Sequence, residues 1–146
     1  MTEDQVIRKA IRIVEGRLQK TEGFVHAPFE AHQLAILKLA DRKAEVFAVL
    51  FLNTRHQLIE FREMFHGTID SATVYPREVA RAALELNAAA VIVVHNHPSG
   101  IPEPSEADRS ITMKLARALD LLDVRLLDHV IVGGIHSTSM AERGLI

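Results

Sequence analysis

The first part of the chain has apolar residues at the spacing of amphipathic helices. Between positions 3 and 22 they recur three or four residues apart, at Val6, Ile7, Ala10, Ile11, Val14 and Leu18. This spacing puts them on one face of a helix, which Gly23 would end. A similar recurrence of leucine and isoleucine predicts a second helix over residues 28–40.

Two later segments are nearly unbroken apolar runs of strand length. They are residues 45–52 and 90–94, with the sequences EVFAVLFL and AVIVV. Runs of this kind are typical of strands that are covered on both faces. The polar tetrapeptide at 53–56 follows the first run, so we expect a tight turn there and an antiparallel partner strand over 57–61.

The rest of the chain alternates between helical and strand patterns. Pro76 stands in the first turn of a helix predicted to end near Asn87, and Ser105 opens another that continues to Leu122. Shorter strands are predicted over 71–75, 124–127 and 129–132, before a turn at Gly133 and Gly134. The whole pattern predicts an α/β (α+β) fold, with one mixed central β-sheet flanked by helices.

Length and composition fit a single domain. The chain has 146 residues, of which 48% are hydrophobic, enough to fill one core. We expect residues 1–42 to form a helical segment packed on a core domain of residues 43–146. The sequence contains no cysteine, which excludes disulfides and thiolate metal ligands. Any metal site in this chain must therefore use nitrogen and oxygen ligands.

The charge balance argues against a nucleic-acid partner. The chain carries 17 basic and 19 acidic residues, a net charge of −2, so phosphate binding would gain little from counterion release. Basic residues near the N-terminus are interleaved with acidic ones, as on a solvated helix face. No apolar run reaches the roughly 18 residues of a membrane span, and no signal-peptide pattern begins the chain. These features favour a cytoplasmic protein without a membrane partner.

The chemically informative segment follows the second apolar run and reads HNHPSGIPEPSEAD, residues 95–108. His95 and His97 stand two positions apart at a strand end, so their side chains project to the same side. The loop after them is rich in proline and glycine. It allows Asp108, in the first turn of the next helix, to point back toward the strand end. Two imidazoles and one carboxylate leave a fourth position for water, the arrangement of a catalytic zinc site.

Each part of this segment also has a plain structural interpretation. A His-x-His pair alone is a weak sign of metal binding, and Ser105 with Asp108 forms a helix N-cap with an acidic third residue. Pro98 and Gly100 are ordinary turn residues. The capping interpretation does not exclude metal binding. From the residues alone, a metal site and a purely structural loop are about equally supported.

The order His-x-His, seven residues, Ser, two residues, Asp resembles the signature of the JAMM (JAB/MPN) metallopeptidases. The motif HNHPSG-x-P-x-PS-x-x-D is similar to the motif of the RadC-like branch of that superfamily. Further stretches that resemble this branch are 46–53, 65–68, 74–78, 87–90 and 128–133. The resemblance runs from about Glu45 to the C-terminus, and it implies a JAMM/MPN, cytidine deaminase-like architecture.

The resemblance implies a role for each matching residue. His95, His97 and Asp108 match the ligands of a zinc ion. Glu45, just ahead of an early buried strand, matches the glutamate that acts as general acid/base, although the residue alone equally suits an exposed strand-edge carboxylate. Ser105 matches the serine that helps to stabilise the oxyanion. The implied activity is zinc-dependent hydrolysis of an amide bond in a peptide or isopeptide substrate.

Other features leave alternatives open. Asp128 and His129 also match the family and could orient a ligand imidazole, although a polar pair that holds a strand end is the simpler interpretation. The segment ahead of the core domain shows no helix-hairpin-helix module, which full-length RadC-like proteins carry, so the chain resembles short bacterial forms. A DNA-repair accessory factor and a non-catalytic interaction module of the same fold are the alternatives to a hydrolase. The complete ligand set counts against the second of these.

Overall fold

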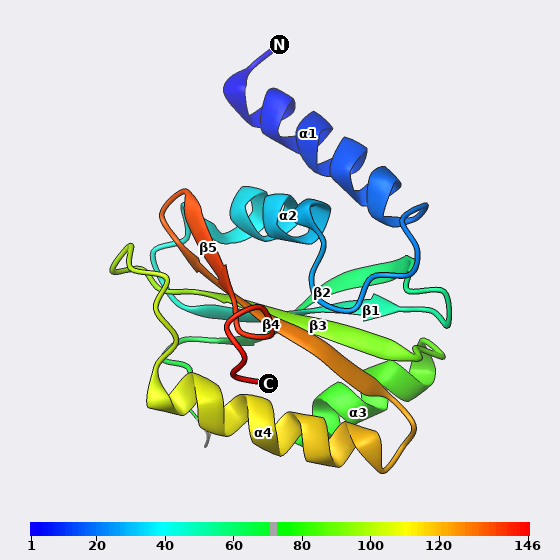
Figure 1. The fold of residues 1–146 in the computed structure, drawn as a ribbon. Helices are drawn as coiled ribbons and strands as arrows, with labels where there is room; N and C mark the ends of the chain where they lie inside the picture. Colours follow the sequence, from blue (N-terminus) through cyan, green and yellow to red (C-terminus); the bar gives the residue numbers. More distant parts are fainter. Residues whose placement is uncertain (71–72) are drawn as a thin grey trace.

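The computed structural model describes residues 1–70 and 73–146, and within them helices cover one β-sheet from both sides (Figure 1). The helices are α1 (Glu3–Leu18), α2 (Phe29–Leu39), α3 (Pro76–Glu85) and α4 (Glu106–Asp120). The strands are β1 (Val46–Leu52), β2 (Leu58–His66), β3 (Ala90–Asn96), β4 (Arg125–Gly133) and β5 (His136–Ser139). The predicted α+β fold, a mixed sheet flanked by helices, is confirmed.

The five-stranded sheet has the order β2-β1-β3-β4-β5. Strands β3 and β4 are parallel and are connected through α4, whereas the other neighbouring pairs are antiparallel. A parallel pair has its two carboxyl ends at the same edge of the sheet. The end of β3 therefore lies beside the end of β4, and the chain leaves it there into the loop that precedes α4.

Both faces of the sheet are covered, which explains why the sequences of β1 and β3 are almost continuously apolar. In β1, Ala48 and Leu50 belong to the core beneath α1 and α2, whereas Phe47 and Val49 belong to the core beneath α3 and α4. Figure 1 shows the same three layers. The alternation of side chains along each strand thus decides which residues face α4, where the informative segment continues.

The last strands differ from their prediction. The segments 124–127 and 129–132 were expected as two strands, but they belong to the single strand β4. The polar Asp128 between them is fully buried, and its carboxylate accepts backbone hydrogen bonds, so that it does not interrupt the strand. The final strand β5 has the polar sequence HSTS, whose lack of apolar alternation gave no signal.

Two further strand boundaries differ from the prediction. Strand β2 continues past the expected range 57–61 to His66, because an edge strand tolerates the polar residues in its second half. The strand expected over 71–75 is wrong for Thr73–Tyr75, which lead into α3 without strand pairing. Residues 71–72 lie outside the described residues.

The N-terminal helices join the sheet through α2. Helix α1 packs on α2, and α2 contacts β3, β4 and β5. The division between residues 1–42 and 43–146 stays a prediction. Across the part of the chain that the structure describes, no helix combines the length and apolar character required to span a membrane.

Candidate metal centre

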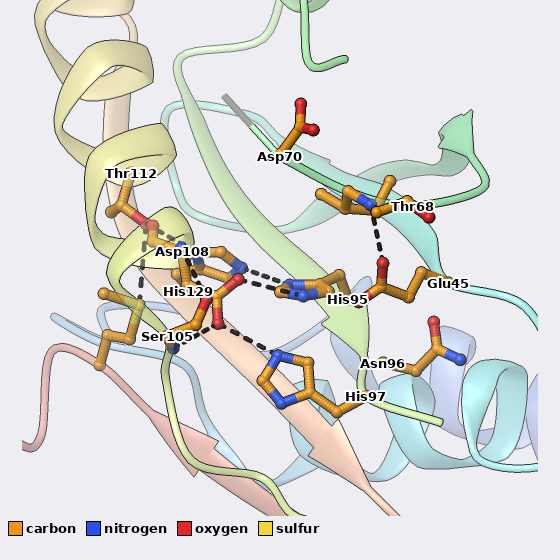
Figure 2. Close-up of polar contacts among 12 residues, drawn as sticks. Glu45, Thr68, Asp70, His95, Asn96, His97, Ser105, Asp108, Thr112 and His129 are labelled. Atoms are coloured by element: carbon orange, nitrogen blue, oxygen red, sulfur yellow. Dashed lines mark hydrogen bonds and ion pairs between the residues drawn. The ribbon is translucent and has the colours of Figure 1, made fainter. Parts of the chain in front are cut away.

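The two histidines of the informative segment lie at and just after the end of β3. His95 and His97 are separated by one residue, so strand alternation turns both rings toward α4 (Figure 2). The His95 side chain is fully buried, whereas 15% of the His97 side chain is exposed. The His97 N–H donates to the Val132 carbonyl at 2.7 Å. This bond continues the pairing with β4 and fixes the backbone that carries both rings.

Asp108 reaches the same space from the first turn of α4. Ser105 is the N-cap of this helix, and its Oγ accepts the Asp108 N–H at 3.1 Å. In return, Asp108 Oδ2 accepts the Ser105 N–H at 2.7 Å. This reciprocal pair is a capping box. The cap also fixes the side-chain conformation in which the carboxylate faces the histidines.

The structure brings the three predicted ligands together. His95 Nε2 lies 3.1 Å from Asp108 Oδ1, and His97 Nε2 lies 3.1 Å from Asp108 Oδ2 (Figure 2). The potential ligand atoms of the three residues all lie within 4.8 Å of one another. Within residues 1–70 and 73–146, this is the group of histidine and acidic residues that could hold a metal ion.

Burial and hydrogen bonding set the charges in the cluster. Burial lowers the pKa of His95 to about 4, which leaves its imidazole neutral at pH 7. The hydrogen bond with Asp108 raises the pKa of His97. Burial alone would raise the pKa of Asp108, but the hydrogen bonds with His97 and with the Ser105 N–H hold it well below its usual range. The carboxylate is therefore an anion over the whole physiological pH range.

The donor atoms fit a metal ion. His95 Nε2 is buried, and no described residue makes a hydrogen bond to it. His97 Nδ1 lies 2.9 Å from the Ile101 carbonyl, which can only accept, so the neutral ring has its lone pair at Nε2. Two nitrogen lone pairs and an anionic carboxylate thus point at one another, an arrangement that a cation stabilises. Two imidazole nitrogens and one carboxylate oxygen are thus a donor set that could hold a metal ion.

Glu45 lies beside this cluster, in the position just before β1 (Figure 2). Its Oε2 accepts the Ile69 N–H at 2.7 Å, and this bond holds the side chain in place. After the hydrogen bond with Asp108, the negative charge of Glu45 also contributes to the raised pKa of His97. The Glu45 carboxylate therefore lies near enough to His97 for its charge to act on that imidazole.

Two glutamates on the neighbouring strand β2 have other partners. Glu60 and Glu63 lie on β2, where they form ion pairs with Arg62 and Arg42, respectively. The location of Glu45 depends on how β1 pairs with β3, which the sequence does not show. Of these three carboxylates, the one that the resemblance selected is the one beside the histidines.

Asn96, between the two histidines, is a residue whose role the sequence did not reveal. Strand alternation turns its buried side chain to the opposite face, where Oδ1 accepts the Val46 N–H at 2.7 Å. Its Nδ2 donates to the Ala44 carbonyl at 3.1 Å and to the Arg42 carbonyl at 3.4 Å. The amide therefore hydrogen-bonds to the backbone on both sides of Glu45. These bonds fix the position of Glu45 relative to β3, the strand that ends at the histidines.

Asp128 and His129 separate into two different roles. His129 points into the core beneath α4, where its Nε2 lies 3.0 Å from His95 Nδ1. This contact agrees with the interpretation that His129 orients a ligand imidazole. Asp128 points to the other face, and its carboxylate accepts hydrogen bonds from Ala27, Ser139 and Ala141. Asp128 therefore holds the chain together, as the simpler interpretation expected.

Fold and site together define a JAB-type domain with a His-His-Asp group that could hold a metal ion. The sequence model of the RadC-like JAB domain matches residues 25–145 of this chain. A UPF0758 protein of Vibrio cholerae is 54% identical over 142 residues, which cover 97% of this chain and 89% of that protein. A UPF0758 protein of a Marinomonas species is 69% identical over 102 residues, or 70% of this chain and 46% of that protein.

A third relative, from Xylella fastidiosa, is 58% identical over 120 residues, which cover 82% of this chain and 54% of that protein. The chain belongs to the RadC-like JAB domain family, and its relatives are bacterial UPF0758 proteins. It spans about half the length of the Marinomonas and Xylella proteins. A JAB domain with this ligand group has the parts of a metallohydrolase.

Proposed function

We propose that the protein is a zinc-dependent hydrolase that cleaves an amide bond in a peptide or isopeptide substrate. The observation that carries the proposal is the buried Nε2 of His95, which lacks a hydrogen-bond partner among the described residues and faces Asp108. An empty hydrogen-bonding position of this kind is unfavourable in a protein interior unless something else fills it. A zinc ion held by His95, His97 and Asp108 would fill this position.

The residues around the cluster supply the remaining chemistry. When bound, zinc acts as a Lewis acid and lowers the pKa of a coordinated water to roughly 7. Glu45 accepts the proton of the attacking water as the water oxygen bonds to the substrate carbonyl carbon. The same carboxyl then donates this proton to the amine as the carbon–nitrogen bond breaks. Ile69 keeps Glu45 in position through its N–H.

Ser105 is suited to the charge that develops on the substrate. Its Oγ accepts the Asp108 N–H, so the cap does not use the hydroxyl hydrogen. We propose that this hydrogen is donated to the substrate carbonyl oxygen, where negative charge grows in the transition state. The two hydrogen bonds of the capping box thus fix both the Ser105 hydroxyl and the Asp108 carboxylate.

The setting that we propose for this reaction is the bacterial cytoplasm. The relatives come from bacteria, and the chain contains no cysteine to stabilise it in an oxidising compartment. The net charge of −2 supports a protein substrate rather than a nucleic acid.

The first test is the zinc content of the purified protein, with Asp108→Ala as the comparison. We expect about one zinc per wild-type chain, as for a site with three protein ligands, and loss of the metal in the variant. Glu45→Gln should keep the zinc and lose hydrolysis of fluorogenic peptide and isopeptide substrates. A wild-type protein that stays metal-free after incubation with zinc would refute the hydrolase and favour an interaction module.

A further inference from the structure

A chain of buried hydrogen bonds leads from His95 back to the helix that carries Asp108. His95 Nδ1 lies 3.0 Å from His129 Nε2, and His129 Nδ1 lies 2.6 Å from Thr112 Oγ1. Thr112 Oγ1 in turn lies 2.6 Å from the backbone carbonyl of Asp108. At most 1% of each of these residues is exposed, so water does not compete for the bonds. Figure 2 shows the chain on the α4 side of the cluster.

The last acceptor in this chain fixes the position of every hydrogen. A carbonyl oxygen can only accept, so the single hydroxyl hydrogen of Thr112 is donated to Asp108. The Met140 sulfur, 3.7 Å from the same hydroxyl, is a weaker acceptor. Thr112 Oγ1 must then accept from His129 Nδ1–H, and a neutral His129 has its lone pair at Nε2. His95 therefore donates its Nδ1–H to His129 and keeps its lone pair at Nε2.

We propose that His129 and Thr112 are positioning residues that hold His95 in the one tautomer able to bind the metal through Nε2. The inference rests on the proposed zinc site and adds to it the means by which one ligand is prepared. Metal-binding histidines commonly donate their second ring nitrogen to a protein group. For His97 that group is the Ile101 carbonyl, and for His95 it is His129.

The chain also closes a ring between the two ligands. It starts at His95 on β3, crosses β4 at His129 and ends on the backbone of Asp108 itself. A shift of α4 along the sheet would break the bond between Thr112 and His129, because the bond from Thr112 to the Asp108 carbonyl lies within α4 and moves with it. The ring therefore keeps the carboxylate of α4 in register with the imidazole of β3.

An aromatic side chain closes the remaining side of this ring. Phe47 stacks on the His95 ring at 6.1 Å between centroids and meets the His129 ring edge-on at 5.7 Å. Both imidazoles are thus confined to planes in which their nitrogens face each other. No water reaches these fully buried rings to replace His129 as the acceptor.

The test is the zinc affinity of Thr112→Val, measured by competition with a chromogenic chelator. Valine has nearly the shape of threonine but neither accepts from His129 nor donates to Asp108. We expect zinc binding to weaken by 10- to 100-fold, the usual effect of removing such a partner. Thr112→Ser keeps the hydroxyl and should bind zinc within about threefold of wild type. Ile111→Val, in the same buried turn of α4, is the control for a small packing defect and should bind zinc normally.

A second readout reports the tautomer directly and does not depend on the variant. Long-range proton–nitrogen NMR of the wild-type imidazoles should show His129 with its hydrogen on Nδ1, with or without zinc. Hydrogen on Nε2 of His129 would overturn the inference, and so would a Thr112→Val protein that binds zinc as wild type does. If the wild type binds no zinc at all, the hydrolase proposal fails, whereas the tautomer measurement still tests this chain of bonds.

Discussion

At the scale of single residues, Asp108 shows why two interpretations of one motif can both hold. Its two carboxylate oxygens face different partners: Oδ1 faces His95, and Oδ2 faces His97 while it accepts the Ser105 N–H. A capping carboxylate is already held in one conformation, so its side chain is ordered before a metal ion binds. The sequence showed which residues meet, because their spacing follows from strand alternation and a helix cap.

Protonation of the buried imidazoles makes the stability of the metal-free protein depend on pH. The folded-state pKa of His95 is about 4 and that of His129 about 3, both lowered by burial from 6.5. Between pH 6.5 and 4.5 the unfolded chain therefore binds more protons, and the free energy of unfolding falls as the pH falls. The raised pKa of His97 acts in the opposite direction and offsets part of this loss.

We expect a net decrease on the order of 2 kcal/mol over this pH range, measured by urea denaturation of the metal-free protein. The exposed His136→Gln is the matched control and should leave the pH dependence unchanged. Equal denaturation midpoints at both pH values would mean that the folded protein takes up these protons as readily as the unfolded chain.

At the scale of secondary-structure elements, the pairing of β1 with β3 decides whether Glu45 reaches the ligands. Asn96 fastens the start of β1 through the Val46 N–H and the Ala44 carbonyl. Asn96→Ala leaves these backbone groups without their partner in a buried place, and we expect a loss of about 1–3 kcal/mol in stability. We also expect a lower kcat with zinc retained, because Glu45 moves while the ligands stay.

Asn53 offers a matched control at the other end of β1. Its side chain accepts the backbone N–H groups of Arg55 and Gln57 in the turn to β2, a bonding role similar to that of Asn96. Asn53→Ala should lower the melting temperature but leave kcat unchanged. If both variants reduce kcat in proportion to lost stability, the bond network of Asn96 has no particular bearing on Glu45.

The loop between β3 and α4 depends on a close approach by Gly133 at the end of β4. A Cβ atom there would lie 2.5 Å from Pro102 N and 2.7 Å from the Ile101 carbonyl carbon, both backbone atoms. Gly133→Ala should therefore displace the loop that delivers Asp108, with a loss of about 1–3 kcal/mol and weaker zinc binding.

The control for this substitution is Gly16→Ala in α1. A Cβ atom at Gly16 meets nothing within 4 Å, and alanine is favoured over glycine in a helix by roughly 0.5–1 kcal/mol. In thermal unfolding, the melting temperature should fall for Gly133→Ala and rise for Gly16→Ala. A stabilised Gly133→Ala protein would show that the loop adjusts without consequence for the site.

The elements also show what a sequence pattern contains and what it lacks. The apolar runs of β1 and β3 predicted the sheet, and the motif at 95–108 predicted that His95, His97 and Asp108 meet and that Ser105 caps α4. Thr112 was not predictable, because a threonine inside a helix has no distinctive pattern and only the packing of α4 on β4 brings it to His129. The continuity of β4 through Asp128 was also missed, because the pattern does not show that this polar side chain is buried and accepts hydrogen bonds from Ala27, Ser139 and Ala141.

At the scale of the whole molecule, one buried carboxylate on β4 links the segment before α2 to the end of β5 and the residues just after it. Asp128 accepts hydrogen bonds from the Ala27 N–H at 2.9 Å, the Ser139 hydroxyl at 2.5 Å and the Ala141 N–H at 3.0 Å. Ala27 precedes α2, so this bond crosses the predicted boundary between residues 1–42 and 43–146. The N-terminal helices are therefore joined to β4 by a hydrogen bond as well as by apolar packing.

Asp128→Asn should loosen this connection without touching the metal ligands. The amide that replaces one oxygen is itself a donor, so it faces N–H and O–H groups that it cannot accept from. We expect a loss of about 3 kcal/mol, because hydrogen bonds to a charged group are the stronger kind. The exposed Asp120→Asn, at the end of α4, is the control and should change stability by less than about 0.5 kcal/mol.

In the Asp128→Asn variant, the rate of amide hydrogen exchange should increase first in α2, while β3 keeps its protection and zinc binding is unchanged. Uniform exchange in α2 and β3 would instead show that both segments unfold as one unit, and that the boundary at residue 42 has no thermodynamic meaning.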